Sequence, residues 1–278
     1  MKKGLVLISI LLLTTMLLAA CGSGGGSEEA TSEEGEIFRV GMECGYPPFN
    51  WTQMDDSNGA VEIEGNPEFA GGYDVEIAKR IADGLDKKLV IVKTEWDGLV
   101  PALLSGKIDA IIAGMSPTAE RKETIDFSIN YYKSDLVMVV KKGGKYENAN
   151  SIQDFEGAKI TAQLNTFHYT VIDQIEGVDK QPAMDNFPAM RVALESGMID
   201  GYVSERPEGV SAESANPNFK MVEFTDGFVT SDDDTAIAVG LVKGSELTEK
   251  INEILSGISE EEQKQIMDTA IENQPVAQ

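Results

Sequence analysis

The feature that most constrains the fold of this chain is an alternation of strand-like and helix-like segments. Residues 37–41 and 89–92 read as strands, and residues 73–85 between them carry apolar side chains at helical spacing. A second series of the same kind begins after the polar break at 141–145. Alternation of this kind is typical of α/β proteins, in which helices cover a sheet. We therefore expect two α/β units, built one after the other.

The remaining expected elements fill the two units in order. Further strands are expected at 108–113, 131–140, 159–163, 201–204, 219–224 and 235–242. Further helices are expected at 99–104, 166–175, 187–195 and from a cap at Ser259 to about Asp268, with a short one after the capping box at 151–154. The strand at 235–242 would return the chain to the first unit. Two lobes joined by two crossings are therefore the favoured architecture.

The segment from Ala113 to Arg121 joins the end of a buried strand to the start of a helix. Ser116 is a good N-cap and Pro117 fits the first helical position, so we expect the helix to begin there. The free N–H groups of a helix start attract an anion, and the Arg121 guanidinium can bind a carboxylate with two parallel hydrogen bonds. Alone, the pattern is equally typical of an ordinary capped helix.

The amino terminus predicts a protein outside the cytoplasm. Two lysines precede an apolar run at 5–18, which is short for a membrane span and typical of a signal peptide. Leu18-Ala19-Ala20-Cys21 resembles the lipobox of bacterial lipoproteins, which implies cleavage after residue 20 and a lipid on Cys21. An ordinary signal peptide with a chance cysteine is the alternative. Residues 21–36, rich in Gly, Ser and Glu, are expected to form a flexible tether.

Composition excludes several classes of function. The 47 acidic and 23 basic residues give a net charge of −24, which argues against nucleic-acid binding. The chain has two cysteines, one histidine and no Cys/His spacing typical of a metal site, so we expect no metal and no cofactor. If Cys21 is lipidated, no intramolecular disulfide can form. Cys44 is then expected to be a small buried residue.

Five blocks of sequence occur in an order that is specific, although each block alone is weak. They are 41–51 (GMECGYPPFNW), 72–78 (GYDVEIA), 96–103 (WDGLVPAL), 113–128 (AGMSPTAERKETIDFS) and 200–205 (DGYVSE). In this order they resemble the polar amino-acid branch, family 3, of the bacterial solute-binding proteins, the extracytoplasmic receptors of ABC importers. The likeness covers about residues 37–270.

The resemblance implies a periplasmic-binding-protein-like α/β fold, with two lobes joined by a two-strand hinge and a ligand cleft between them. The implied hinge crossings are residues 132–136 and 226–234, and closure over the ligand would be a hinge motion. The implied boundaries are 1–20 for the signal peptide, 21–36 for the tether, 37–133 and 233–278 for the first lobe, and 134–232 for the second lobe.

The resemblance also implies which residues hold the backbone end of an amino acid. Arg121 matches the arginine that clamps the α-carboxylate, assisted by Ser116 and, from the second lobe, by Thr166. Gly114 matches a position whose backbone meets the α-ammonium. Glu205 matches an acidic residue, usually aspartate, that pairs with the same ammonium.

Three further positions match residues that surround the ligand side chain. Tyr46 and Trp96 match aromatic walls, and Glu43 matches an acid that meets the side-chain tip in relatives binding basic amino acids or glutamine. Ordinary alternatives stay open: the two aromatic residues would be core residues, and Glu43 would be a solvated acid.

Several positions in the second lobe depart from the family pattern or have plain alternatives. Asn165 stands where glycine is usual, but asparagine tolerates the left-handed backbone, so we expect the turn to survive. Phe167 replaces a residue that is often small and polar. Glu205 is one methylene longer than aspartate, and its alternative role is to pair only with Arg206. His168 is expected to be an exposed helix residue.

The function implied is capture of a polar amino acid by a monomeric, lipid-anchored receptor that delivers it to a membrane permease. Glu43 and Glu205 favour a basic ligand, arginine or lysine, with glutamine as the close rival. The implied partners are the free amino acid, the permease and the membrane, through Cys21. We expect no enzyme. A dehydratase of the same fold, with a glutamate as acid, and a ligand sensor are the alternatives.

Overall fold

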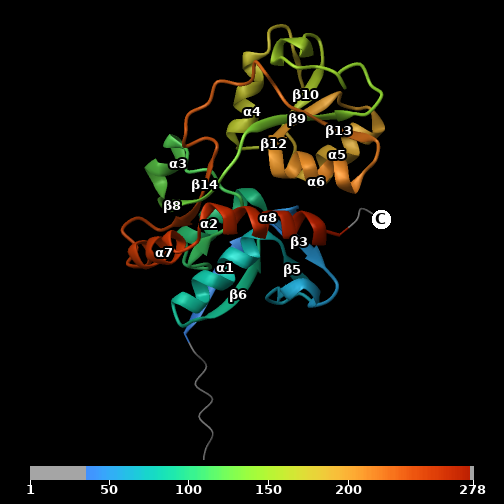
Figure 1. Ribbon diagram of the computed structural model, residues 1–278. Coiled ribbons are helices and arrows are strands. Elements are labelled where there is room, and N and C mark those ends of the chain that lie inside the picture. Colours follow the sequence, from blue (N-terminus) through green and yellow to red (C-terminus); the bar gives the residue numbers. More distant parts are fainter. Residues whose placement is uncertain (1–35, 276–278) are drawn as a thin grey trace, which may run out of the picture. The chain divides into compact units, whose positions relative to one another are not determined.

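The computed structural model of the protein describes residues 36–275 (Figure 1). The predicted signal peptide, Cys21 and all but the last residue of the predicted tether lie outside the described residues. Within residues 36–275, no helix combines the length and the apolar character that a membrane crossing requires.

The first lobe is built on a five-stranded mixed sheet. Its strand order is β6 (Lys88–Lys93), β1 (Ile37–Met42), β7 (Ala110–Ile111), β14 (Ala236–Leu241) and β8 (Asp126–Lys133). β1 pairs in parallel with β6 and β7, whereas β14 is antiparallel to β7 and β8. The helices α1 (Tyr73–Gly84), α2 (Leu99–Leu104) and α7 (Leu247–Ser256) pack against this sheet. All six residues of β14 are buried, as expected for a strand inside a covered sheet.

The second lobe repeats this plan with a second five-stranded sheet. Its order is β11 (Asp179–Lys180), β10 (Lys159–Thr161), β12 (Gly201–Glu205), β9 (Leu136–Lys141) and β13 (Phe219–Val222). β10 is parallel to β11 and β12, and β9 is antiparallel to β12 and β13. The helices of this lobe are α4 (Phe167–Val171), α5 (Phe187–Ser196) and α6 (Arg206–Ala215). The α/β class and the two-sheet architecture expected from the sequence are confirmed.

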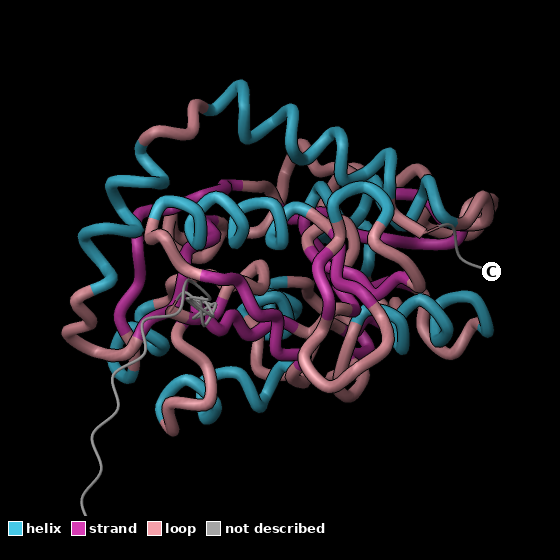
Figure 2. The backbone as a smooth tube through the Cα atoms, turned by 90° about the horizontal axis from the view of Figure 1, so that it is seen from below, coloured by secondary structure: helices cyan, strands magenta, loops and turns pink. Residues whose placement is uncertain are grey.

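The chain passes twice between the two sheets. It leaves β8 after Lys133, enters β9 at Leu136, and returns from β13 to β14 through residues 223–235 (Figure 1). Figure 2 shows the same backbone from below, with helices on both sides of the strands. The β-prone run at 131–140 is therefore shared by two strands, since β8 belongs to the first sheet and β9 to the second. Residues 134–135 separate two β-prone runs that hydrophobicity alone does not divide.

Smaller elements complete the structure. A four-stranded sheet in the order β2 (Gly45–Tyr46), β3 (Asn50–Gln53), β5 (Phe69–Gly71), β4 (Val61–Glu62) borders the first lobe. Four short 3₁₀ helices are η1 (Ser57–Gly59), η2 (Trp96–Gly98), η3 (Ile152–Phe155) and η4 (Ile172–Gln174). The capping box expected at 151–154 opens η3, with both of its hydrogen bonds formed.

The C-terminal helix α8 (Glu260–Asn273) begins at its expected cap, Ser259, but is longer than predicted. It packs against α1 of the first lobe and α6 of the second (Figure 1). At its end, the Ser211 hydroxyl of α6 donates a hydrogen bond to Gln274 Oε1. Helices α6 and α7 lie in segments for which the sequence predicted no element.

Candidate functional site

The structure brings most of the predicted site residues to one small cavity between the two lobes. Seven of the eight predicted ligand-binding residues line it, together with three that the sequence did not suggest, Gln163, Phe167 and His168. The seven are Tyr46, Trp96, Gly114, Ser116, Arg121, Thr166 and Glu205. The eighth, Glu43, lies next to the cavity and accepts a hydrogen bond from Gln163.

The helix after the strand β7 begins two residues later than the sequence predicted. The helix α3 (Ala119–Thr124) has Thr118 as its N-cap, whose hydroxyl accepts from the N–H of Arg121 at 3.4 Å. Ser116 therefore does not cap the helix, and its hydroxyl donates to the carbonyl oxygen of Asp234 at 2.9 Å. Both Ser116 and Thr118 are good N-cap residues, so the sequence pattern was ambiguous between them.

The Arg121 guanidinium extends from α3 across the cavity. Its Nη1 donates to the carbonyl oxygen of Ser116 at 2.9 Å, and its Nη2 donates to the carbonyl oxygen of Asn165, in the second lobe, at 3.0 Å. Its central carbon lies 4.9 Å from the centre of the Trp96 ring, which is cation–π distance. Burial lowers the pKa of Arg121 to about 10, so the side chain stays charged at neutral pH.

Aromatic side chains form the opposite wall. The Tyr46 ring stacks on Phe187 of α5, with ring centres 4.3 Å apart and an interplanar angle of 3°. Gly114 faces the same ring: a Cβ at this position would lie 2.6 Å from Tyr46 Cε1, and its φ is +62°. Glycine is therefore required here both by backbone conformation and by the close approach of Tyr46.

Glu43 is a buried carboxyl at the end of β1. It is 8% exposed, its Oε1 accepts from Gln163 Nε2 at 2.9 Å, and its Oε2 has no hydrogen-bond partner among the described residues. Burial is the main cause that raises the pKa of Glu43 to about 8; the hydrogen bond from Gln163 opposes the rise, and the charges of Glu95, Asp97 and Asp74 add to it. The alternative of a solvated acid is therefore wrong.

Glu205 ends β12 on the second-lobe side of the cavity. It is 4% exposed, and its Oε1 lies 3.3 Å from Nε2 of His168, which is also buried. The alternative pairing with Arg206 does not occur, because Arg206 pairs with Glu223 and Asp135 instead. The expectation that His168 is exposed is wrong: α4 turns this residue toward the cavity rather than toward solvent.

The turn before α4 holds the second-lobe side of the site. Asn165 has a φ of +55°, so asparagine does adopt the left-handed conformation expected of it. Its Nδ2 donates to Asp97 of the first lobe at 2.8 Å. Thr166 is the N-cap residue of α4, and its hydroxyl donates to the carbonyl oxygen of Gln163 at 2.7 Å.

The cavity itself is small in this conformation. Its free volume is about 10 Å³, roughly what one water molecule needs. Direct contacts join the two lobes around it, including the Glu43–Gln163 and Asn165–Asp97 hydrogen bonds and the Tyr46–Phe187 stack. An amino acid can therefore enter only if the side chains or the lobes move apart.

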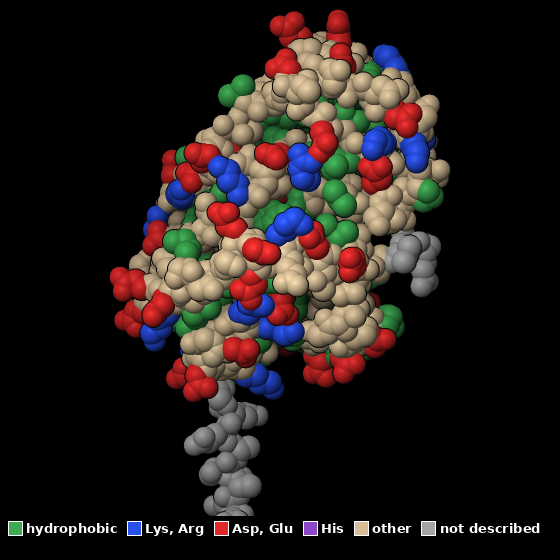
Figure 3. All heavy atoms as spheres, viewed as in Figure 1, with side chains coloured by type: hydrophobic (Ala, Val, Ile, Leu, Met, Phe, Trp, Pro, Cys, Tyr) green, Lys and Arg blue, Asp and Glu red, His purple; other side chains and the backbone are tan. Residues whose placement is uncertain are grey.

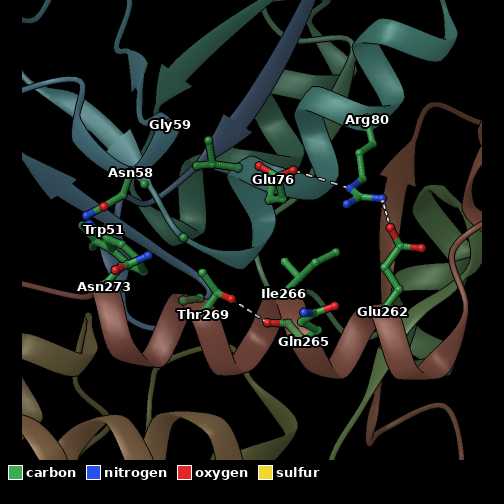
Figure 4. A pocket seen from close by; sticks show the side chains of 14 residues that line it. Trp51, Asn58, Gly59, Glu76, Arg80, Glu262, Gln265, Ile266, Thr269 and Asn273 are labelled. Atoms are coloured by element: carbon green, nitrogen blue, oxygen red, sulfur yellow. Dashed lines mark hydrogen bonds and ion pairs between the residues drawn. The ribbon is translucent and has the colours of Figure 1, made fainter.

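A larger cavity of about 300 Å³ lies between α8 and α1 (Figure 4). Its charged side chains pair with one another, because Arg80 lies between Glu76, at 3.5 Å, and Glu262, at 2.6 Å, and among the buried side-chain atoms of its lining residues only Arg80 Nε lacks a hydrogen-bond partner within residues 36–275. By contrast, the small cavity is bordered by buried polar atoms without partners among residues 36–275, on Glu43, Tyr46, His168 and Glu205. Buried polar atoms are normally hydrogen-bonded, so the small cavity is the better candidate for a ligand site.

Three further observations concern metal binding, the free cysteine and the surface charges. Among residues 36–275, no group of three or more His, Cys, Asp or Glu side chains is arranged to hold a metal ion. Cys44 is free and buried, as expected. On the face shown in Figure 3, acidic side chains lie among basic ones rather than in separate areas.

The sequence did not identify Gln163, His168 and Phe187 as site residues. Gln163 lies two residues after the strand β10, at the edge of the sheet where Glu205 ends β12, and this position was a usable signal. His168 and Phe187 each lie at the start of a helix, and periodicity alone does not show that these helices face the first lobe.

Comparison with known proteins agrees with this fold. The chain matches the bacterial extracellular solute-binding proteins, family 3, over residues 38–272. It is 34% identical over 193 residues to a probable histidine-binding protein of Campylobacter jejuni, which covers 68% of each chain. Two solved structures are also similar to this chain.

The first is an amino-acid ABC transporter substrate-binding protein from Streptococcus pneumoniae bound to L-arginine. It has a TM-score of 0.75 and 28% identity, and the match covers 85% of this chain and 94% of that one. The second is an ancestral arginine-binding protein bound to glutamine, with a TM-score of 0.69, 31% identity and coverage of 84% and 96%.

The family match and the similar solved structures define an extracytoplasmic substrate-binding protein of an amino-acid ABC transporter, a class without enzymatic activity. The chain belongs to the bacterial extracellular solute-binding proteins, family 3.

Proposed function

We propose that the cavity between the lobes captures a basic amino acid, arginine or lysine. The observation that carries this proposal is the charge of the buried groups. Glu43 and Glu205 each keep one carboxylate oxygen without a partner among the described residues, while Arg121 supplies a single guanidinium. A ligand with one carboxylate and two cationic groups complements this set. Burial favours the protonated form of Glu43, and a cation beside it would favour the ionised form, so that each charge then meets an opposite one.

The roles we propose follow this complementarity. Arg121 binds the α-carboxylate, with Ser116 and Thr166 beside it. Glu205 and the backbone at Gly114 bind the α-ammonium. The guanidinium uses two of its five N–H donors on the carbonyl oxygens of Ser116 and Asn165, which leaves three for the carboxylate.

The ligand side chain would then lie between Tyr46 and Trp96 and point toward Glu43. Supporting this direction, Glu43 is buried behind Gln163, and its Oε2 has no partner among residues 36–275. Glutamine is the second candidate, because its amide can donate to the same oxygen. The relative bound to glutamine is 31% identical to this chain.

We further propose the cellular setting. The lipobox-like sequence at 18–21 supports cleavage after residue 20, a lipid on Cys21 and a tether over 21–36. The receptor would act as a monomer held at the membrane and deliver its ligand to the permease. Lobes of residues 37–133 with 233–278, and of 134–232, would close by a hinge at the two crossings.

A thermal-shift screen of the purified protein against the twenty amino acids tests the proposal. A ligand at 100 times its dissociation constant adds about 2.7 kcal/mol of stability, so we expect a clear rise in melting temperature with arginine or lysine. A rise with none of the twenty amino acids would refute the proposal, and a rise with glutamine alone would favour the second candidate.

Glu43→Gln separates the two ligands. It should weaken binding of a cationic ligand far more than binding of glutamine, because it removes a negative charge but keeps a hydrogen-bond acceptor. Equal weakening of both ligands would remove the case for a basic side chain.

A further inference from the structure

His168 is the buried polar side chain of the site for which neither the sequence nor the fold gives a role. It is the second residue of α4, is 5% exposed and lines the cavity. Neither of its ring nitrogens has a hydrogen-bond partner among the described residues. A buried imidazole without partners is rare unless a ligand or a neighbour completes its bonding.

The neighbour in reach is Glu205. His168 Nε2 lies 3.3 Å from Glu205 Oε1, close enough for attraction but without the alignment of a hydrogen bond. The ring of Phe167 packs on the imidazole, with centres 4.3 Å apart, and limits how the ring can turn. The other carboxylate oxygen, Oε2 of Glu205, is buried and also lacks a partner among the described residues.

These contacts place the two carboxylate oxygens of Glu205 in different surroundings. Oε1 faces the imidazole of α4, and Oε2 is left for another donor. A glutamate side chain has three rotatable bonds, so without a contact on Oε1 the carboxylate would sample several orientations in an opened cleft. An imidazole that carries its proton on Nε2 can donate to Oε1 and remain neutral.

We propose that His168 is a positioning residue, whose Nε2–H holds Glu205 Oε1 and thereby directs Oε2 at the α-ammonium of the ligand. The inference rests on the proposed function, in which Glu205 binds that ammonium. The 3.3 Å separation shortens to an aligned hydrogen bond when the ligand fixes the carboxylate, as bonds to charged acceptors are usually shorter.

Binding of a ligand pair tests this role. The probes are L-arginine and 5-guanidinovaleric acid, which is arginine without the α-ammonium, measured by isothermal titration calorimetry. His168→Ala should weaken the binding of L-arginine by about tenfold, which is about 1.4 kcal/mol, and the binding of the analogue by less than about twofold. His168→Gln places an amide N–H near the position of Nε2 and should restore most of the affinity.

Thr170→Ala is the matched control, because Thr170 lies on the same helix but is exposed; it should change neither affinity. In the Glu205→Gln background, His168→Ala should reduce the affinity for L-arginine little further. Equal losses for both ligands, or no loss for L-arginine, would overturn the positioning role. If the wild type binds another amino acid instead, the same comparison is made with that amino acid and its des-amino analogue.

A ligand-free readout keeps this inference separate from the proposed function. His168 is the only histidine of the chain, so a protein without a histidine tag gives a single imidazole ¹⁵N signal set. We expect the neutral tautomer protonated at Nε2, with an Nε2 shift that changes in Glu205→Gln and not in Thr170→Ala. A proton on Nδ1, or an Nε2 signal indifferent to Glu205→Gln, would refute the inference whether or not any amino acid binds.

Discussion

At the scale of single residues, the pocket is an unbalanced set of buried charges. Arg121 is the guanidinium that reaches the cavity, while Glu43 and Glu205 bring two carboxyl groups. Removing such groups from water is costly unless each gains a partner. The free protein moderates this cost in part by donating from Gln163 to Glu43 and by pointing Arg121 at backbone carbonyl oxygens. A zwitterionic ligand would supply better partners.

Arg121→Ala should abolish measurable binding while the fold persists. Loss of two charge-assisted hydrogen bonds to a carboxylate costs about 3 kcal/mol or more, which is roughly a hundredfold or more in affinity. Calorimetric titration gives the affinity, and circular dichroism melting checks the fold. Because α3 keeps its Thr118 cap, the melting temperature should change little. Wild-type affinity in this variant would contradict the carboxylate clamp.

Glu43 should make the empty protein less stable as pH rises. Its pKa of about 8 in the folded state lies above the ordinary value of 4.5, so the unfolded chain loses this proton first. The stabilising contribution is therefore full below about pH 4.5 and is lost as pH rises to about 8, by at most about 1.4 kcal/mol per pH unit.

Urea unfolding of the wild type and Glu43→Gln from pH 5 to pH 8 measures this effect. The difference in unfolding free energy should shift with pH in favour of the variant, since glutamine still accepts from Gln163 but has no proton to lose. Asp74, whose pKa burial raises to about 7, titrates in both proteins, so the difference between them reports Glu43 together with its coupling to Asp74. Parallel pH profiles would show that Glu43 is not a buried acid.

At the residue scale, the resemblance and the structure agree on which residues lie together, while the binding roles of these residues stay predictions. Arg121, Gly114 and Glu205 follow strands or open helices at the cleft edge, and all three line the cavity. Prediction from the sequence failed for His168, because whether the second residue of a short helix faces solvent or the other lobe depends on tertiary packing. A five-residue helix is too short for its hydrophobic periodicity to show which way this residue faces.

At the scale of elements, a buried polar network holds the second lobe together. Glu208 of α6 is fully buried and accepts from Arg191 of α5, at 2.8 and 3.0 Å, and from the Tyr202 and Ser204 hydroxyls of β12, at 3.0 and 2.6 Å. The network joins two helices to the strand that carries Glu205. It therefore links the stability of the lobe to the geometry of the site.

Glu208→Ala should destabilise the protein by about 3–5 kcal/mol, because it leaves the Arg191 charge buried without its partner. Glu213→Ala is the matched control on the same helix: its partner Lys220 is half-exposed, so the loss should stay near 0–1 kcal/mol. Urea unfolding compares the two. Similar losses for both variants would mean that the network adds nothing beyond a surface pair.

Most strands and helices could be predicted, and the misses have physical reasons. The run at 131–140 is β-prone throughout, and only the pairing of β8 and β9 with different sheets divides it. The helix α6 begins with Arg206 and Pro207 and contains Gly209, a residue of low helix propensity. At this position packing favours glycine, because a Cβ on Gly209 would lie 2.8 Å from the Met221 side chain of β13.

At the scale of the whole molecule, the described lobes meet through contacts that surround the cavity. The Glu43–Gln163 and Asp97–Asn165 hydrogen bonds and the Tyr46–Phe187 stack all join residues of different lobes. Because the cavity holds only about 10 Å³, these contacts must separate before a ligand enters.

Small-angle X-ray scattering tests this requirement. The ligand-free protein should populate a more open arrangement, so its radius of gyration should fall when a saturating amino acid is added. Arg121→Ala should show no such fall, because it cannot bind the carboxylate. A radius that is the same with and without a bound ligand would argue against closure by a hinge.

The central claim is that one amino acid, with a cationic side chain, binds between Arg121, Glu205 and Glu43. Isothermal titration of the wild-type protein with L-arginine tests it most directly. The account predicts saturable binding of one molecule per chain, and strong weakening in Glu43→Gln. No binding of L-arginine or L-lysine, or undiminished binding of either in Glu43→Gln, would contradict it.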